Sequence, residues 1–190
     1  MPPRVRASGP RIEPADWRSC RPDVAELLRA GEEAGGGSSN VNGILAKHPG
    51  LYKRFAPFAA KLLYGGRLPS TDREVLVLRT AWRTRSEYQW VHHVRYGRAA
   101  GLDDAVIEAV REPGLSETLS AFQRVLVRAA DLLIDEHELD EATYRSLREA
   151  YDDPQLIELV MLVGHYTMLA GLLNTLGVEL EPHVRTPQPQ

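Results

Sequence analysis

Residues 69–101 read PSTDREVLVLRTAWRTRSEYQWVHHVRYGRAAG, and this stretch decides how the chain folds. The spacing Thr71-x-x-Glu74 is typical of a capping box at a helix N-terminus, and the apolar run Val75–Trp82 follows it. A second such spacing, Ser86-x-x-Gln89, opens a segment that ends at Gly101, a residue type that commonly closes helices. The pattern therefore predicts two consecutive helices joined by a short turn.

The two predicted helices carry titratable side chains that a short connection would bring together. On the second helix, Ser86, Gln89 and His93 share one face, because steps of three and four residues return to the same side of a helix. Glu74 lies on the first helix. We therefore expect the Glu74 carboxylate and the His93 imidazole to meet across the turn.

Length and composition are those of a compact globular domain: 190 residues, 43% hydrophobic and 26% charged. The net charge is -3 and the basic residues are scattered, so there is no electrostatic reason to expect a nucleic-acid partner. Cys20 is the single cysteine, so an intrachain disulfide is impossible and we expect a cytoplasmic protein. The first residues have no apolar core, so we expect no secretory signal there.

Helical signals recur along the rest of the chain, and no segment of useful length alternates apolar and polar residues. The sequence therefore predicts an all-α, single-domain helical bundle over residues 22–180. A proline-rich arm, residues 1–21, precedes this domain, and a tail, residues 181–190, follows it. Besides the two central helices, we expect helices at 22–34, 41–47, 50–63, 103–111, 117–135, 141–151 and 153–176, with Ser116 and Asp140 as N-caps and with Gly101 and Gly177 as C-terminal glycines.

The segment 156–176 is apolar enough to suggest a membrane span. It carries Glu158, His165 and Asn174, however, and it lacks the flanking charges of a span. We expect a core helix that is buried on all sides, in part against another subunit, and no membrane partner.

The phrase DREVLVLRTAWRTRSEYQWVHHVRYGRAAGL, residues 72–102, resembles the carboxymuconolactone decarboxylase family, which shares an all-α fold with the alkylhydroperoxide reductase D-type peroxidases. Two weaker phrases support the resemblance, NVNGILAKHPGL at 40–51 and ELVMLVGHYTMLAGLLNTLGVEL at 158–180. The resemblance implies a helical bundle of the alkylhydroperoxidase D-like type. It also implies a homo-oligomer, a trimer or a multiple of one.

The peroxidase branch of this fold is recognised by Cys-x-x-Cys-x-x-x-His, with a glutamate twelve residues before the first cysteine. The matching positions here are Ser86, Gln89, His93 and Glu74. The acid and the histidine are present and both thiols are absent. Because serine and glutamine cannot pass through a thiol redox cycle, the sequence argues against a thiol peroxidase.

What the resemblance implies instead is a cofactor-independent lyase that removes carbon dioxide from a small carboxylated lactone or a related enolisable acid. His93 would donate or accept the proton, and Glu74 would orient the His93 imidazole and set its charge. No metal and no organic cofactor is expected, because the substrate itself can take up the electrons. The further candidates for contact with this small-molecule substrate are Ser86, Gln89, Tyr88, Trp90, His92 and His165.

Two other functions remain open: another acid/base enzyme on the same scaffold, an isomerase or a tailoring enzyme, or a non-catalytic ligand-binding oligomer. Each candidate residue also has a purely structural interpretation. Glu74, Ser86 and Gln89 could simply cap helices, and His93 could be a buried structural histidine. His165 could belong to a hydrogen-bond network inside the core, and His92 could face solvent or a second subunit. We expect surface or interface ion pairs, one of which could instead bind a substrate carboxylate, at Arg79, Arg83, Arg85 and Arg95.

Overall fold

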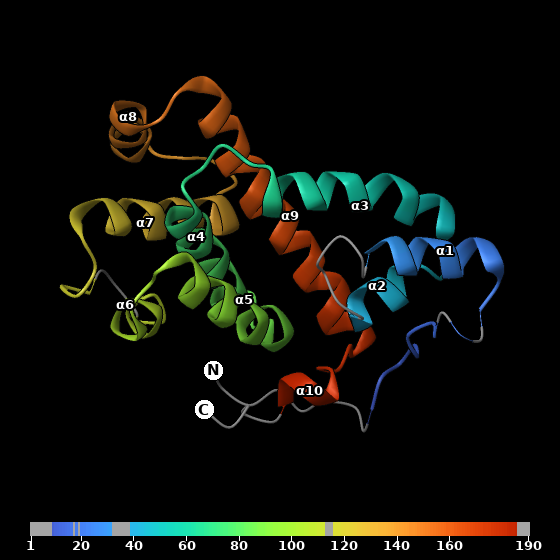
Figure 1. The fold of residues 1–190 in the computed structure, drawn as a ribbon. Coiled ribbons are helices and arrows are strands. Elements are labelled where there is room, and N and C mark those ends of the chain that lie inside the picture. The colour runs from blue at the N-terminus through green and yellow to red at the C-terminus, as the bar shows by residue number, and fades with distance from the viewer. Residues whose placement is uncertain (1–8, 17, 19, 32–38, 113–115, 186–190) are drawn as a thin grey trace. The chain divides into compact units, whose positions relative to one another are not determined.

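The computed structural model describes residues 9–16, 18, 20–31, 39–112 and 116–185, and every regular element within them is an α-helix (Figure 1). The all-α prediction is therefore confirmed. The chain divides into two compact units, one formed by Gly66–Gly171 and the other by Pro2–Gly65 with Leu172–Gln190. The helices in chain order are α1 Pro22–Gly31, α2 Asn40–Leu45, α3 Pro49–Tyr64, α4 Ser70–Arg83, α5 Glu87–Ala100, α6 Asp104–Ala109, α7 Ala121–Asp135, α8 Glu141–Ala150, α9 Asp153–Leu176 and α10 Pro182–Arg185.

Helix α4 is the centre of the unit Gly66–Gly171. It packs against both α5 and α7, while α6 packs on α5 and α8 on α7 (Figure 1). The apolar run in α4 is buried on all sides, since Val75, Leu76, Val77 and Leu78 are each at most 1% exposed. Burial of four branched side chains stabilises the unit by several kcal/mol, at about 1.5–3 kcal/mol each. A polar residue on this helix must therefore find its partners inside the protein.

Three helix ends lie where the sequence predicts them: two C-terminal glycines and one N-cap aspartate. Gly101 and Gly177 have φ angles of +97° and +66°, a left-handed conformation that glycine adopts without strain. The Asp140 side chain accepts a hydrogen bond from the Thr143 amide at 2.7 Å, as an N-cap should. The prediction was correct at these three positions.

Two predicted N-caps were wrong, at Thr71 and Ser116, and a third, Ser86, has the predicted position but not the predicted side-chain bonds. The N-cap of α4 is Pro69, which makes no side-chain cap bond, and the N-cap of α5 is Ser86, whose side chain makes none either. Helix α7 begins at Ala121, where Ser120 and Gln123 form a complete capping box, and not after Ser116. The carboxylate of Glu74 and the amide of Gln89 bond to other elements instead of capping their own helices.

The loop before α4 is fixed by a carboxylate of α9. Glu158 accepts hydrogen bonds from the backbone amides of Arg67, at 2.7 Å, and Leu68, at 3.1 Å. Gln155 donates to the Arg67 carbonyl oxygen at 3.1 Å. The Glu158 carboxylate lies so close to Gly66 that a Cβ there would approach its Oε1 to 2.2 Å. These contacts set where α4 starts, and so they help to place Glu74.

The substitution Gly66→Ala is expected to lower the free energy of unfolding by about 1–3 kcal/mol, because the new methyl group displaces the Glu158 carboxylate from two backbone donors. Urea denaturation followed by circular dichroism measures the change. The matched control is Gly50→Ala, since a Cβ at Gly50 has no neighbour closer than 4.0 Å. Equal stability of the two variants would contradict this role for Glu158.

The second unit has a small core of its own on α1, α2 and α3, formed by Val24, Leu28, Leu45, Ala46 and Tyr52. Its part of the N-terminal arm is held by two backbone bonds, from Arg11 to the Leu176 carbonyl at 2.8 Å and from Ala15 to the Gly43 carbonyl at 3.0 Å. The predicted tail contains helix α10. Residues 1–8 of the arm and 186–190 of the tail lie outside the described residues.

Helix α9 is long and apolar enough to cross a bilayer by length and composition, although core helices of water-soluble proteins meet the same criteria. Within the described part of the chain it is the one helix of this kind, and 39% of its most apolar window is buried. The expected burial on all sides does not occur within this chain. One face is exposed, and its members recur at helical spacing: Ile157, Val160, Met161, Gly164, Met168 and Gly171. Average apolarity alone could not reveal this face.

Candidate active site

A tight corner between α4 and α5 builds the site. The Thr84 hydroxyl donates to the Thr80 carbonyl at 2.7 Å, and the Ser86 amide donates to the Ala81 carbonyl at 2.9 Å. Arg85 between them has a φ angle of +55°, which reverses the chain within a few residues. Helix α5 therefore returns alongside α4, and a side chain near the start of α4 comes to lie opposite one in the middle of α5.

The predicted contact between Glu74 and His93 is present. Oε2 of Glu74 lies 2.7 Å from Nδ1 of His93, and both residues are buried, at 0% and 5% exposure. The other carboxylate oxygen, Oε1, accepts a hydrogen bond from Nε of Arg73 at 2.9 Å. Both oxygens of the Glu74 carboxylate are thus bound. Because Glu74 contacts Nδ1 of His93, the other ring nitrogen, Nε2, takes no part in this hydrogen bond.

The charge state of Glu74 follows from these partners. Burial alone would raise the pKa of this carboxyl, but the charge and hydrogen bond of His93, together with those of Arg73, outweigh it and lower the pKa. Because Glu74 is ionised and can only accept, Nδ1 of His93 carries the proton of their hydrogen bond. The carboxylate can then stabilise an imidazolium that forms at His93.

Aromatic rings surround the imidazole of His93. Tyr96 on the same helix and Tyr166 on α9 both contact it edge to face, with centroid distances of 5.2 and 4.9 Å. Sequence reasoning missed these two rings and Arg73 as site residues. Arg73 stands directly before Glu74 and Tyr96 is three residues after His93, so both were visible in the motif, whereas the approach of Tyr166 depends on how α9 packs.

Ser86 and Gln89 are buried on the same side of α5, at 0% and 2% exposure. Nε2 of Gln89 donates to the backbone carbonyl of Tyr166 at 3.1 Å, which joins α5 to α9. Among the described residues, the Ser86 Oγ and the Gln89 Oε1 are buried atoms without a hydrogen-bond partner. Buried polar groups of this kind are rare in native proteins.

His165 lies on α9 and packs its ring against Tyr166, with the centroids 5.1 Å apart. Burial, and then the nearby charge of His93, lower the pKa of His165 to about 4. At neutral pH this second imidazole is uncharged. Both histidines therefore contact the ring of Tyr166, and His165 is the one that burial keeps uncharged at neutral pH.

Stability is expected to fall on the acid side because of His165. In the unfolded chain an imidazole takes up a proton near pH 6.5, whereas folded His165 does so near pH 4. The unfolded state therefore binds more protons as the pH falls through this interval, and up to about 3 kcal/mol of stability is lost. Urea denaturation from pH 7 to 4 should show this loss for the parent chain and a smaller one for His165→Gln. Parallel curves would contradict the assignment.

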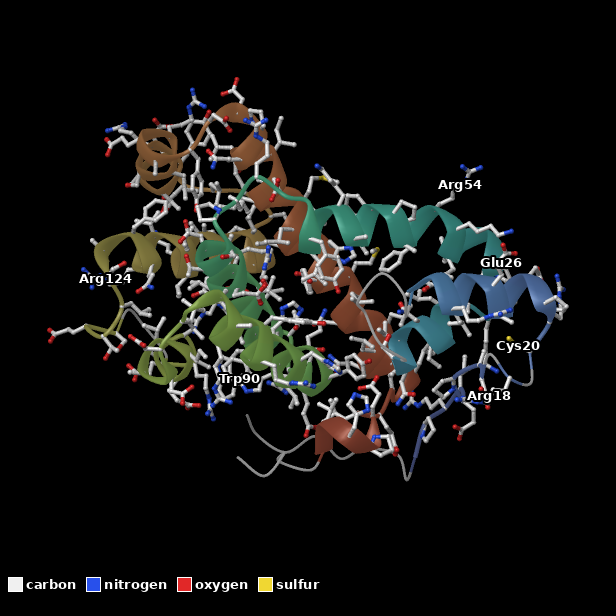
Figure 2. All side chains as sticks on the ribbon, in the orientation of Figure 1. Arg18, Cys20, Glu26, Arg54, Trp90 and Arg124 are labelled. Atoms are coloured by element: carbon white, nitrogen blue, oxygen red, sulfur yellow. The ribbon has the colours of Figure 1, made fainter. Side chains whose placement is uncertain are left out.

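The other candidate residues on α5 make ring contacts of their own. Tyr88 and His92 pair with each other, with their ring centroids 4.6 Å apart. Trp90 lies on α5 (Figure 2). Its ring packs against that of Trp82, with the centroids 5.6 Å apart, and the Arg111 guanidinium lies over both indoles. Neither set of contacts tests whether Tyr88, Trp90 or His92 touches a substrate, so that role stays a prediction.

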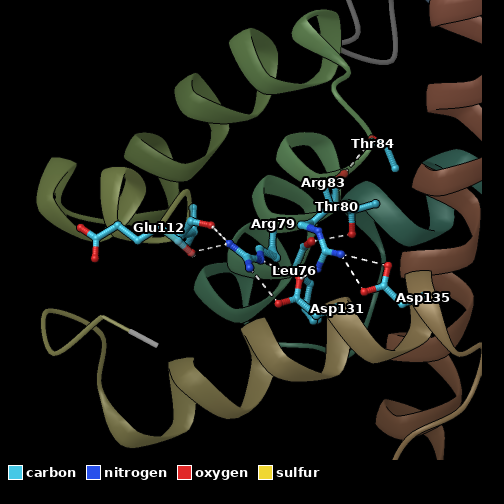
Figure 3. A network of polar contacts seen from close by, with 9 residues as sticks. Leu76, Arg79, Thr80, Arg83, Thr84, Glu112, Asp131 and Asp135 are labelled. Carbon is cyan, nitrogen blue, oxygen red and sulfur yellow. Dashed lines mark hydrogen bonds and ion pairs between the residues drawn. The ribbon is translucent and has the colours of Figure 1, made fainter. Parts of the chain in front are cut away.

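Arg79 is a buried structural residue, and the prediction of a surface pair was wrong for it. Its guanidinium makes two bonds of 2.7 Å to the Asp131 carboxylate on α7 (Figure 3). It also donates to the backbone carbonyls of Val110, at 2.6 Å, and Glu112, at 3.0 Å. Arg83 on the next turn pairs with Asp131 and Asp135. With four of its hydrogen bonds made to these acceptors, Arg79 joins α4 to α7.

Among the described residues, no three histidine, cysteine, aspartate or glutamate side chains form a group that could hold a metal ion. The chemistry that the described site can perform with its own side chains is proton transfer at His93, supported by Glu74.

Residues 49–131, which include both Glu74 and His93, match the model of the carboxymuconolactone decarboxylase family. No curated protein sequence matches the chain. The resemblance inferred from the sequence is thus confirmed over these residues.

Solved structures confirm the fold over nearly the whole chain. A protein of Ralstonia eutropha JMP134, described as an alkylhydroperoxidase AhpD core and an uncharacterized peroxidase-related protein, superposes with a TM-score of 0.79 at 20% identity, covering 96% of this chain and 100% of that one. A peroxidase-related protein of Silicibacter sp. TM1040 gives 0.77 at 17%, covering 95% and 96%. A debrominase bound to 2,3,4-tribromopyrrole gives 0.74 at 16%, covering 95% of each chain. The chain has the alkylhydroperoxidase D-like fold.

Proposed function

We propose that the protein is a cofactor-independent lyase that uses His93 as its proton donor on a small carboxylated lactone or a related enolisable acid. The observation that carries this proposal is the buried contact of 2.7 Å between Glu74 and His93, with Arg73 on the other carboxylate oxygen. A fixed and ionised carboxylate beside an imidazole suits general acid catalysis, because it orients the ring and stabilises its protonated form. The match of residues 49–131 to the decarboxylase family supports the choice of reaction.

The proposed reaction begins with the loss of carbon dioxide from the substrate carboxylate. The carbon–carbon bond breaks, and its electron pair moves into the unsaturated lactone, which becomes an enolate. Protonated His93 then donates the proton on Nε2 to carbon, and Glu74 stabilises the imidazolium until this transfer. Each turnover consumes one proton, which His93 regains from solvent. His165 remains uncharged at neutral pH and so adds no second positive charge beside His93.

Thiol peroxidase chemistry finds no support at this site. Ser86 and Gln89 occupy the positions that carry the two thiols in the peroxidase branch, and neither can form a sulfenic acid or a disulfide. We therefore expect no peroxidase activity with thiol donors.

The test is the release of carbon dioxide from a carboxylated, unsaturated five-membered lactone in deuterated water. Release together with deuterium in the product supports the lyase. Incorporation of deuterium without release of carbon dioxide would replace it with an isomerase-type acid/base enzyme on the same scaffold. Neither event over a panel of such lactones and β-keto acids would instead favour a non-catalytic binding protein.

We further propose that the protein acts as a cytoplasmic homo-oligomer, a trimer or a multiple of one. The exposed apolar face of α9 supports self-association, because four large side chains there are open to solvent: Ile157, Val160, Met161 and Met168. Gly164 and Gly171 lie on the same face, and no described residue lies within 4 Å of a Cβ built at either position. Packing among the described residues therefore does not explain two glycines that weaken a helix. Sedimentation of the parent chain and of Met168→Glu tests the proposal, and an unchanged mass of the variant would argue against it.

A further inference from the structure

The first turn of α5 contains two buried polar atoms whose hydrogen-bonding capacity is unused within the described chain. They are the Oγ of Ser86 and the Oε1 of Gln89, three residues apart on the helix face that also carries His93. Leaving such an atom without a partner costs on the order of 1–3 kcal/mol. Two neighbouring cases beside a candidate catalytic histidine indicate a partner that comes from outside the chain.

The orientation of the Gln89 amide defines what that partner must be. A backbone carbonyl can only accept a hydrogen bond, so the atom of Gln89 that faces the Tyr166 carbonyl at 3.1 Å must be the NH₂ nitrogen. The remaining Oε1 is then an acceptor in a fixed position. A carboxylate or any other group that only accepts would be repelled there, whereas a hydroxyl or an N–H group would bond.

Ser86 adds flexibility to this recognition. Its hydroxyl makes no cap bond to α5, and it can either donate or accept. The guanidinium groups of Arg73 and Arg79 on α4 are already paired with carboxylates, those of Glu74 and Asp131.

We propose that Gln89 and Ser86 form a subsite for an uncharged hydrogen-bond donor of the substrate, a hydroxyl or an N–H group, separate from the carbon that His93 protonates and from the carboxylate that leaves. The inference rests on the proposed function and narrows its substrate class: a hydroxylated or N–H-bearing enolisable acid, bound with its donor on Gln89 Oε1. Substrates with only carboxylate and ester oxygens lack this contact.

Binding of small probes to the full chain tests the subsite without turnover. Phenol offers a donor, anisole has nearly the same shape without one, and benzoate offers only acceptors. In titrations followed by nitrogen–proton correlation spectra, phenol should shift the side-chain amide of Gln89 and bind about tenfold more tightly than anisole or benzoate. Gln89→Met should reduce phenol binding to the level of anisole. Equal binding of phenol and anisole, or full phenol binding to Gln89→Met, would overturn the proposal.

A matched control keeps the binding test specific. Gln155 also donates its amide to a backbone carbonyl, that of Arg67, but its oxygen already accepts from the Asp152 amide at 3.0 Å. Gln155→Met should therefore leave phenol binding unchanged, and a loss equal to that of Gln89→Met would count against the subsite.

A comparison of two N-cap serines, Ser86 and Ser120, tests Ser86 by stability alone. Ser120 accepts a real cap bond from the Gln123 amide at 3.1 Å, so Ser120→Ala should lower the melting temperature. Ser86→Ala removes an unpartnered hydroxyl and should leave the melting temperature unchanged or higher. Equal losses would show that Ser86 has a structural role and would overturn its part in the subsite. Probe binding that depends on Gln89 without any release of carbon dioxide would leave the subsite standing and reject the lyase.

Discussion

Replacing His93 with glutamine is expected to lower the turnover of the lactone substrate by about 10²–10⁴-fold, the usual contribution of a general acid. Glutamine retains a polar group of similar size but cannot deliver a proton from Nε2. The measurement is the initial rate of carbon dioxide release at saturating substrate, with circular dichroism to establish that the variant is folded. Most of the loss should appear in kcat, because His93 acts on the transition state rather than on binding.

The neighbouring histidine provides the matched control. His92 is the next residue on α5 and pairs with Tyr88, so His92→Gln changes the same type of side chain one position away. Its turnover should stay within about tenfold of the parent chain. A folded His93→Gln protein with full turnover, or equal losses in both variants, would exclude His93 as the proton donor.

Glu74→Gln should lower turnover as well, since an amide cannot stabilise an imidazolium as a carboxylate does. It also leaves Arg73 without its carboxylate partner at 2.9 Å. The pH dependence separates the two effects. The loss of a charged partner changes the pH profile of kcat, whereas a merely weakened fold lowers the amount of active enzyme at every pH.

The sequence predicted most of the helices because their signals are local. Glycine at Gly101 and Gly177, and aspartate at Asp140, end or begin helices through contacts within a few residues. The sequence also contains the signal for the start of α7, since Ser120-x-x-Gln123 has the spacing of a capping box. The prediction placed the N-cap at Ser116 instead. The error there was one of choosing between two local signals.

The site was predictable only as far as one motif reaches. Glu74 fits a cap by spacing, but its carboxylate bonds to a side chain nineteen residues away. The local pattern could not show that the Glu74 carboxylate would bond to this distant side chain rather than to the backbone at the start of its own helix. The contacts from α9, Tyr166 to His93 and to Gln89, depend on the packing of a helix that is apolar on every side in sequence. Periodicity gives no orientation for such a helix.

Arg79→Met is expected to lower the free energy of unfolding by about 3–5 kcal/mol, the largest effect on stability that we predict. The Arg79 guanidinium is 5% exposed and bonds to Asp131 and to two backbone carbonyls. Methionine keeps the length of the side chain but leaves these acceptors without their donor. Arg83 still contacts Asp131, so the loss should fall toward the lower end of the range. Urea denaturation gives the free energy directly.

An exposed ion pair between α5 and α6 is the control that tests whether burial, and not the charge pair itself, causes the loss of stability. Arg98 and Asp104 also form an ion pair at 2.7 Å, but their side chains are 58% and 69% exposed. Water replaces that contact when it is broken, so Arg98→Met should cost no more than about 1 kcal/mol. The loss of stability in Arg79→Lys should lie between those of Arg79→Met and Arg98→Met. Lysine keeps the charge but cannot form the two parallel bonds to Asp131. Equal stability of Arg79→Met and Arg98→Met would mean that α4 is held to α7 by its apolar residues alone.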